Sequence, residues 1–105
     1  MSKKQDLAKL LLSLEETMRS ANLWQESGIK QSLLNSQQPF CHDTLKPEQW
    51  LQFVFIAKLE HLIKVGFPLP ANCDITPYFD EALKEHAQVK EITKLTKQID
   101  NLLSN

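Results

Sequence analysis

Three consecutive residues, Cys41, His42 and Asp43, have the side-chain types of a nucleophile, a base and a group that orients the base. In enzymes that use such a set, the side chains converge in a hydrogen-bonded relay. Side chains of adjacent residues diverge, so this tripeptide does not set up a relay. No serine or cysteine lies in a predicted strand-to-helix elbow either. We interpret the three as a loop thiol, a surface imidazole and a turn or capping carboxylate.

A zinc site is the second chemistry that these residue types allow. Cys41, His42, Cys73 and Asp74 would supply the sulfur, nitrogen and oxygen ligands that zinc accepts. Structural zinc sites use close ligand pairs, however, and neither cysteine belongs to such a pair. We therefore expect two free, reduced thiols and no metal or other cofactor.

Paired carboxylates and phosphate-binding loops also fail to define a site. Glu15-Glu16 and Asp80-Glu81 are neighbours on predicted helices, and neighbouring helical side chains point about 100° apart. With 2 glycines in the chain, there is no glycine-rich loop that could cradle a phosphate. The sequence therefore predicts that the protein is not an enzyme.

Length and composition describe one ordered domain. At 42% hydrophobic and 24% charged residues, the chain resembles ordinary globular proteins, and 105 residues predict a single domain, 1–105. The polar N-terminus predicts no signal peptide, and no apolar run approaches the length of a membrane span. We expect a cytoplasmic protein with no membrane partner.

The charge is balanced both overall and locally. A formal net charge of -1 lacks the positive excess that neutralises phosphates, which argues against direct nucleic-acid binding. Along the C-terminal segment, Glu85, Glu91 and Asp100 intersperse the lysines. This mixture is typical of a solvated helix face.

Apolar residues recur with helical spacing in four segments, and no segment alternates as a strand does. The first spans about residues 3–23, and the last spans about residues 89–102. Before the last, Thr76 and Pro77 predict the start of a helix, with the threonine hydroxyl as its cap. The sequence leaves open whether this helix and the last one form a single kinked helix. The expected fold is all-α, a small four-helix bundle.

The segment that begins at Pro47 is predicted to be the central helix. Proline suits the first helical turn, and Gly66 suits the C-terminal cap. At helical spacing, one broad apolar stripe comprises Leu51, Phe55, Ile56, Leu59, Leu62 and Ile63. Trp50 and Val54 fall on another side, so the N-terminal half is apolar nearly all round. We expect other parts of the chain to cover that half on two sides.

Irregular segments precede and follow the central helix. Residues 24–46 predict only a short helical turn, near Gln31, and a loop this long is usually functional or held by specific contacts. Its expected anchors are Trp24, Leu33, Leu34 and Phe40. Residues 66–72 contain two prolines that keep the backbone extended, and we expect this segment to cross the end of the central helix.

Gln52 is the polar residue that falls in the middle of the buried stripe. A buried amide without hydrogen-bond partners costs on the order of 1–3 kcal/mol. We expect it to bond to backbone groups of residues 35–40. It would then be either a structural anchor for that loop or the polar floor of a ligand or peptide cleft.

Aromatic residues and prolines gather around the same segments. The set is Phe40, Trp50, Phe53, Phe67, Leu69, Tyr78 and Phe79, with Pro39, Pro68 and Pro70 between them. Most of these side chains are expected to fill the core. Trp50 and Val54, however, point toward the proline-rich loops, and a rigid aromatic surface of this kind suits docking of a partner.

Several of these residues form a pattern that resembles the YqcC-like family of small bacterial proteins. The matching residues are Asn35-Ser36-x-Gln38-Pro39-Phe40-x-x-Asp43-Thr44, Pro47-x-x-Trp50-Leu51-Gln52-Phe53, Pro68-Leu69-Pro70 and Pro77-Tyr78. The resemblance covers roughly residues 7–103 and implies a helical bundle without an established biochemical function. Members' genes often neighbour that of a tRNA pseudouridine synthase, which implies a link to RNA modification by association. Cys41 and His42 fall at unspecified positions of the pattern.

The leading hypothesis is a non-enzymatic protein-binding module, such as an accessory subunit of an RNA-modifying enzyme. The alternative is a small-molecule-binding or enzymatic protein with a pocket floored by Gln52 and walled by Trp50 and Tyr78. A direct RNA binder is the weakest hypothesis because of the charge, and the sequence leaves a homo-oligomer open. The candidate binding residues are Asn35, Ser36, Gln38, Pro39, Phe40, Asp43, Thr44, Trp50, Gln52, Phe53, Pro68, Pro70 and Tyr78.

Overall fold

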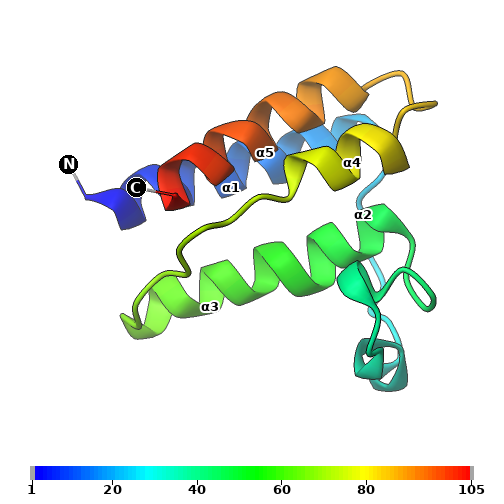
Figure 1. Cartoon of the computed structure of the whole chain (residues 1–105), viewed down its shortest axis with the longest axis horizontal. Coiled ribbons are helices and arrows are strands. Elements are labelled where there is room, and N and C mark those ends of the chain that lie inside the picture. The colour runs from blue at the N-terminus through cyan, green and yellow to red at the C-terminus, as the bar shows by residue number, and fades with distance from the viewer. Residues whose placement is uncertain (1, 105) are drawn as a thin grey trace.

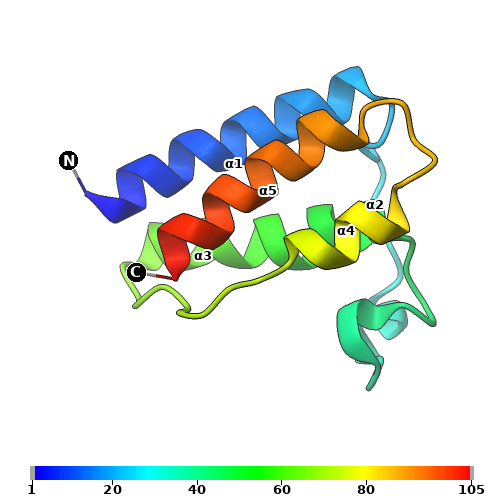
Figure 2. The same ribbon diagram turned by 45° about the horizontal axis from the view of Figure 1, so that its top comes forward.

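The computed structural model describes residues 2–104 as two layers of helices (Figure 1). One layer contains α1 (Lys3–Ser20), α4 (Thr76–Ala82) and α5 (Val89–Leu103), and α5 lies between the other two (Figure 2). The other layer is one long helix, built from α2 (Pro47–Trp50), the π-helical η3 (Leu51–Ile56) and α3 (Ala57–Val65). Two 3-10 turns, η1 (Gln31–Asn35) and η2 (Pro39–Cys41), lie beside its start. The all-α four-helix bundle is confirmed.

The first helix begins as its sequence indicates and ends earlier. The Ser2 hydroxyl accepts a hydrogen bond from the Gln5 N–H at 3.1 Å, which caps the N-terminus. The buried stripe consists of Leu7, Leu11, Leu14 and Met18, which recur with the helical spacing that predicts this helix. The expected end near residue 23 is wrong, because α1 stops at Ser20 and Asn22 takes a left-handed φ of 60°. Asparagine tolerates that conformation, so it turns the chain out of the helix.

The long helix is covered on two sides only in its N-terminal half. Every residue from 47 to 56 is buried or half-buried, which confirms the expectation for this half. The α3 half exposes Ala57, Lys58, Glu60 and His61, so it is an outer layer that packs against α1 on one side. Gly66, at φ 77°, ends the helix as predicted. The π-helical turns of η3 have no signal in the apolar spacing.

The cap of α4 differs from the sequence prediction. The Thr76 hydroxyl does not cap its own helix but donates to Asp100 Oδ2 at 2.7 Å. Asp100, on α5, accepts the backbone N–H of Ile75 at 3.0 Å and that of Thr76 at 2.9 Å. A carboxylate from a neighbouring helix therefore caps α4. The prediction that Asp100 belongs to a solvated face is wrong, because the residue is 6% exposed.

The connections place two loops against the long helix. After Gly66, the proline-rich segment turns back along the helix, where Pro70 and Ala71 face Trp50 and Val54, rather than only crossing its end. Residues 83–88 form a turn that separates α4 from α5, so the last two helical segments are distinct helices. This arrangement brings the aromatic side chains of three separate segments together.

Candidate functional site

The centre of the candidate site is an aromatic cluster formed by Phe40, Trp50, Tyr78 and Phe79. The Phe40 ring stacks on Tyr78, with 4.0 Å between centroids and 6° between planes. Its edge meets Trp50 at 4.8 Å and Phe79 at 6.2 Å. Phe79 is fully buried and the other three are half-buried. The cluster therefore joins η2, the long helix and α4, and confirms Phe40 as an anchor of the loop.

The loop that carries Phe40 is held in a strained shape by its own polar contacts. Phe40 and Cys41 have φ values of 57° and 49°, and left-handed backbone costs an L residue about 1–2 kcal/mol. The Ser36 hydroxyl bonds to the Asp43 carboxylate. The Thr44 hydroxyl donates to the Leu33 carbonyl at 2.7 Å. These contacts and the ring packing of Phe40 compensate for the strain and leave the loop ordered.

A groove continues from the aromatic cluster along the long helix. Its volume is about 240 Å³, and its lining includes Trp50, Val54, Phe55, Lys58, Pro70 and Cys73. Trp50 and Val54 thus face the proline-rich segment, as predicted. Because Trp50 touches Phe40 and also lines the groove, loop and groove form one surface. We call residues 35–44, Trp50 and this groove the docking region.

Gln52 lies outside this region and fastens a different segment. Its Oε1 accepts the Gln25 N–H at 2.8 Å, and its Nε2 donates to the Gln25 carbonyl at 2.8 Å. Gln49 Nε2 also donates to Gln25 Oε1 at 3.1 Å. The prediction that the buried Gln52 amide is hydrogen-bonded is confirmed, but the expected partners at residues 35–40 are wrong.

The pocket expected at Gln52, Trp50 and Tyr78 is not assembled by these side chains. Both polar atoms of Gln52 are occupied by the backbone of Gln25, so the amide is not a free pocket floor. Tyr78 stacks on Phe40, and Trp50 is the one of the three that lines the groove.

The remaining candidates are unequally accessible. The exposed ones are Asn35, Gln38, Pro39, Asp43, Pro68 and Pro70. The half-buried ones are Ser36, Phe40, Thr44, Trp50, Phe53 and Tyr78. The expectation that most of the aromatic set fills the core is wrong. Phe79 is buried, Phe67 is 58% exposed, and the other members are half-buried. A partner would therefore meet the loop and the groove, because the loop itself covers the N-terminal half of the long helix.

Two titratable side chains at the site, the Cys73 thiol and the Tyr78 hydroxyl, keep their protons at neutral pH. Burial, and then the adjacent Asp100 carboxylate, raise the pKa of the Cys73 thiol to about 12. The thiol donates to Asp100 Oδ1 at 3.2 Å. Burial, and then the Glu48 charge, raise the pKa of Tyr78. At neutral pH, Cys73 is not a thiolate nucleophile and Tyr78 is not a base.

The possible metal ligands stay apart. Within residues 2–104, no three histidine, cysteine or acidic side chains gather where they could hold an ion. Cys41 and Cys73 are both free and half-buried. The described helices also include none that is long and apolar enough to cross a bilayer.

Sequence reasoning missed the polar residues that hold the site in place. Thr96 and Asp100 lie four and eight residues after the buried Ile92, so helical periodicity could have placed them inside. Gln25 has no such signal, since its partner Gln52 is 27 residues away in the sequence.

Relatives of this chain are bacterial and mostly uncharacterised. An uncharacterised protein of Haemophilus influenzae is 35% identical over 95 residues, which is 90% of each chain. Protein YqcC of Escherichia coli is 32% identical over 96 residues, covering 90% of this chain and 88% of that one. The solution NMR structure of E. coli YqcC superposes with a TM-score of 0.86 at 30% identity, over all of this chain and 91% of that chain.

A longer relative carries an enzyme name. A tRNA pseudouridine synthase C of Pectobacterium carotovorum is 34% identical over 72 residues, which are 69% of this chain but 19% of that protein. The family model DUF446, described as tRNA pseudouridine synthase C, matches residues 6–102. The extent of these matches and the shared fold show that the chain belongs to the DUF446 family of YqcC-like proteins.

Proposed function

We propose that this protein is a non-enzymatic binding module that docks onto an RNA-modifying enzyme, tRNA pseudouridine synthase C. The observation that carries the proposal is the relative of that name, in which the similar segment makes up 19% of one polypeptide. A covalent connection holds two modules at a high effective concentration, about millimolar for short flexible linkers. A separate chain of the same family needs an interface to achieve the same association.

The docking region has the properties of such an interface. Aromatic anchors dominate binding energy, and ordered surfaces lose little entropy when they bind. Here Trp50 and Phe40 are half-buried anchors, and the hydrogen bonds of Ser36 and Thr44 already order the loop. Exposed Gln38 and Pro39 border the anchors and are available to a partner.

The alternative of a small-molecule pocket has weaker support from the groove. Sites for drug-sized ligands are typically about 300–1,000 Å³. The groove beside Trp50 is smaller, at about 240 Å³. Two of the residues that line it, Pro70 and Ala71, are exposed to solvent. A groove of that size suits one or two apolar side chains of a partner protein.

Titration calorimetry with the separate synthase tests the proposal. The purified chain is titrated into tRNA pseudouridine synthase C from the same organism, without tRNA, and saturable binding is expected. In one variant, Asn35→Arg with Gln38→Arg adds two charges to exposed positions of the loop. In the matched control, Gln5→Arg with Ser20→Arg adds the same charges to exposed positions of α1.

The loop variant is expected to bind at least tenfold more weakly, a loss of about 1.4 kcal/mol. The α1 control is expected to bind like the unmodified chain. Absence of saturable binding by the unmodified chain would refute the proposed function. Equal binding by both variants would show that the interface lies elsewhere.

A further inference from the structure

The outward face of α5 carries a stripe of three lysines. Lys90, Lys94 and Lys97 are all exposed and follow each other at helical spacings of four and three. At 1.5 Å per residue, the stripe is about 10 Å long. Ion pairs of the described residues involve Arg19 and Lys84 but none of these three lysines. The stripe is therefore a strip of positive charge whose three lysines form no ion pair within the described residues.

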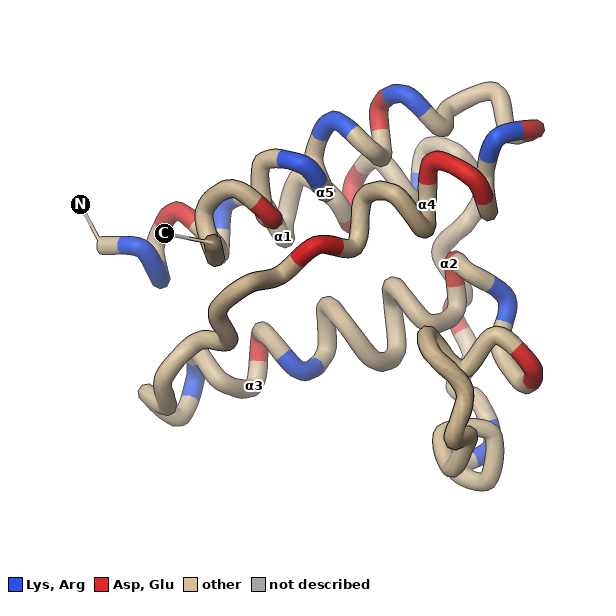
Figure 3. Tube along the Cα trace, viewed as in Figure 1, with Lys and Arg blue, Asp and Glu red and all other residues tan. Residues whose placement is uncertain are grey.

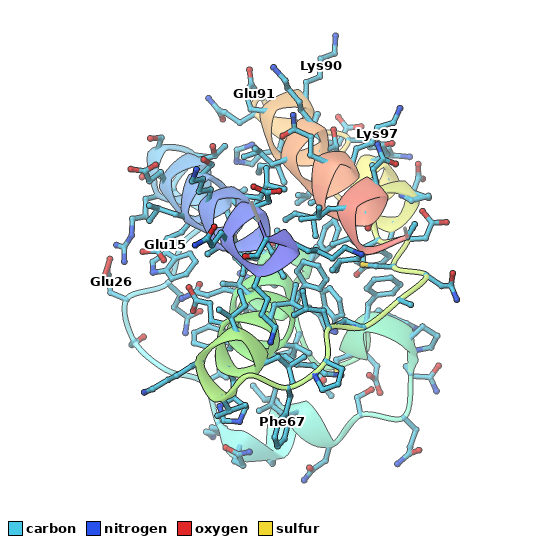
Figure 4. All side chains as sticks on the ribbon, turned by 90° about the vertical axis from the view of Figure 1, so that its left-hand side faces the viewer. Glu15, Glu26, Phe67, Lys90, Glu91 and Lys97 are labelled. Atoms are coloured by element: carbon cyan, nitrogen blue, oxygen red, sulfur yellow. The ribbon has the colours of Figure 1, made fainter. Side chains whose placement is uncertain are left out.

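Burial of one acid makes this face more basic than the sequence indicates. Figure 3 shows an acidic position near each end of α5 with basic positions between them. In the sequence these two acids of α5 are Glu91 and Asp100. Asp100 points inward, where it caps α4, and contributes no charge to the surface. Glu91 remains as the exposed acid of α5. In Figure 4, Lys90 and Lys97 extend away from the molecule, on the side opposite Phe67.

The stripe lies beside a groove between α1 and α5 and away from the docking region. The groove, of about 530 Å³, is lined by Lys9, Gln98 and Asn101 together with Asp6, Leu10 and Leu102. Lysine and amide side chains of this kind bond phosphate and sugar oxygens in nucleic-acid complexes. Because η2 lies beside the other layer, a partner held by the docking region would leave α5 open (Figure 1).

We infer that the Lys90–Lys94–Lys97 stripe contacts the phosphate backbone of tRNA that is held by the enzyme docked on the opposite layer. This inference rests on the proposed function. Three phosphate contacts are too few for tight binding by a chain of net charge -1, so the contact acts within the complex. There it strengthens tRNA binding without reading sequence, since phosphate contacts carry no base information.

The test is a salt series on tRNA binding by the complex of synthase and chain, with labelled tRNA. The stripe variant combines Lys90→Gln, Lys94→Gln and Lys97→Gln. The matched control, Lys30→Gln with Lys46→Gln and Lys64→Gln, removes the same charge from exposed positions outside α5. Each phosphate contact contributes about 0.7–0.9 to the slope of log K against log salt. Adding the unmodified chain to the synthase is expected to steepen the slope of log K for tRNA binding against log salt by about 2.

The stripe variant is expected to lose this increment, and the control is expected to keep it. If both variants keep it, or if the unmodified chain binds the synthase but adds no slope, the inference is overturned. Calorimetry without tRNA separates the two proposals, because both variants are expected to bind the synthase normally. If the stripe variant alone loses synthase binding, the lysines contact an acidic surface of the synthase and not the tRNA. That result would overturn the inference but leave the proposed function standing.

If the chain does not bind the synthase, the proposed function is refuted, and a separate experiment tests the RNA contact. Labelled tRNA is then added to the isolated chain at low salt, and backbone amide shifts are recorded by NMR. Shifts along α5 that disappear in the stripe variant would support the RNA contact independently. Unchanged α5 amides would overturn it.

Discussion

Asp100 holds two helices together through a single carboxylate. It receives the N–H groups of Ile75 and Thr76, the Thr76 hydroxyl and the Cys73 thiol, while Thr96 bonds the same hydroxyl at 2.9 Å. All these donors belong to the start of α4 or to the segment before it. The position of Tyr78, and so of the aromatic cluster, depends on this one side chain of α5.

Asp100→Asn is expected to destabilise the protein by about 2–3 kcal/mol. Hydrogen bonds to a charged group contribute about 1.5–3 kcal/mol. In the variant, the amide NH₂ group would face backbone N–H groups, and it cannot accept hydrogen bonds from them. Urea unfolding followed by circular dichroism measures the change. Asp80→Asn, at an exposed position of α4, is the control and is expected to change stability by less than about 0.5 kcal/mol.

Cys73 is expected to remain a protonated thiol well above neutral pH. Its pKa is raised from 9.0 to about 12 in the folded protein, so folding favours the neutral form. The stability from this site is therefore full below pH 9 and is lost as the pH rises toward 12. In a Cys41→Ser background, alkylation by iodoacetamide should stay slow at pH 9 and accelerate only toward pH 12. Half-maximal thiolate reactivity near pH 9 would contradict this account.

Gln52→Leu tests the hydrogen bonds between the Gln52 side chain and the backbone of Gln25. The substitution leaves the N–H and the carbonyl of Gln25 without their partners, at a cost of about 1–3 kcal/mol. Chemical denaturation should show that loss, and the Gln25 amide should exchange faster with solvent. Gln5→Leu, on the exposed face of α1, is the control. An equally stable variant with slow Gln25 exchange would show that the pair does not hold the segment.

The shape of η2 is determined by ring packing and by the polar contacts of its loop, and not by local backbone preference. The left-handed backbone of Phe40 and Cys41 costs conformational energy. The stacking of the Phe40 ring on Tyr78 offsets that cost. The two contributions are separable by mutation. Cys41→Gly relieves the backbone and should stabilise the protein by up to about 1 kcal/mol. Phe40→Ala keeps the strained backbone, loses the ring contacts and should destabilise it by about 2 kcal/mol.

Thermal unfolding of both variants checks this balance. A destabilised Cys41→Gly would mean that the left-handed backbone is not strained there. A Phe40→Ala variant as stable as the unmodified chain would mean that the loop is held without the aromatic cluster.

Element boundaries follow from local signals, whereas irregular shapes do not. Pro47 and Gly66 mark the ends of the long helix because each has an intrinsic backbone preference. The end of α1 is misplaced by three residues, since the left-handed Asn22 ends it before any glycine. The π-helical stretch at η3 escapes prediction because its apolar residues fit α-helical spacing equally well.

For the whole molecule, apolar periodicity is sufficient to predict the two-layer bundle but not its polar contacts. The buried stripes of α1 and the long helix agree with their spacing because burial of apolar area drives helix packing. Asp100 and Gln52 each bond to backbone groups 24 or more residues away, and no local pattern encodes those partners. The candidate site was therefore predictable in its aromatic residues but not in the contacts that fix them.

Hydrogen exchange of the chain, alone and with tRNA pseudouridine synthase C, tests the central claim most directly. We predict slower exchange in residues 35–44 and in the segment around Pro70, with α1 unchanged. Protection confined to α1, or no change on adding saturating synthase, would contradict docking through this surface.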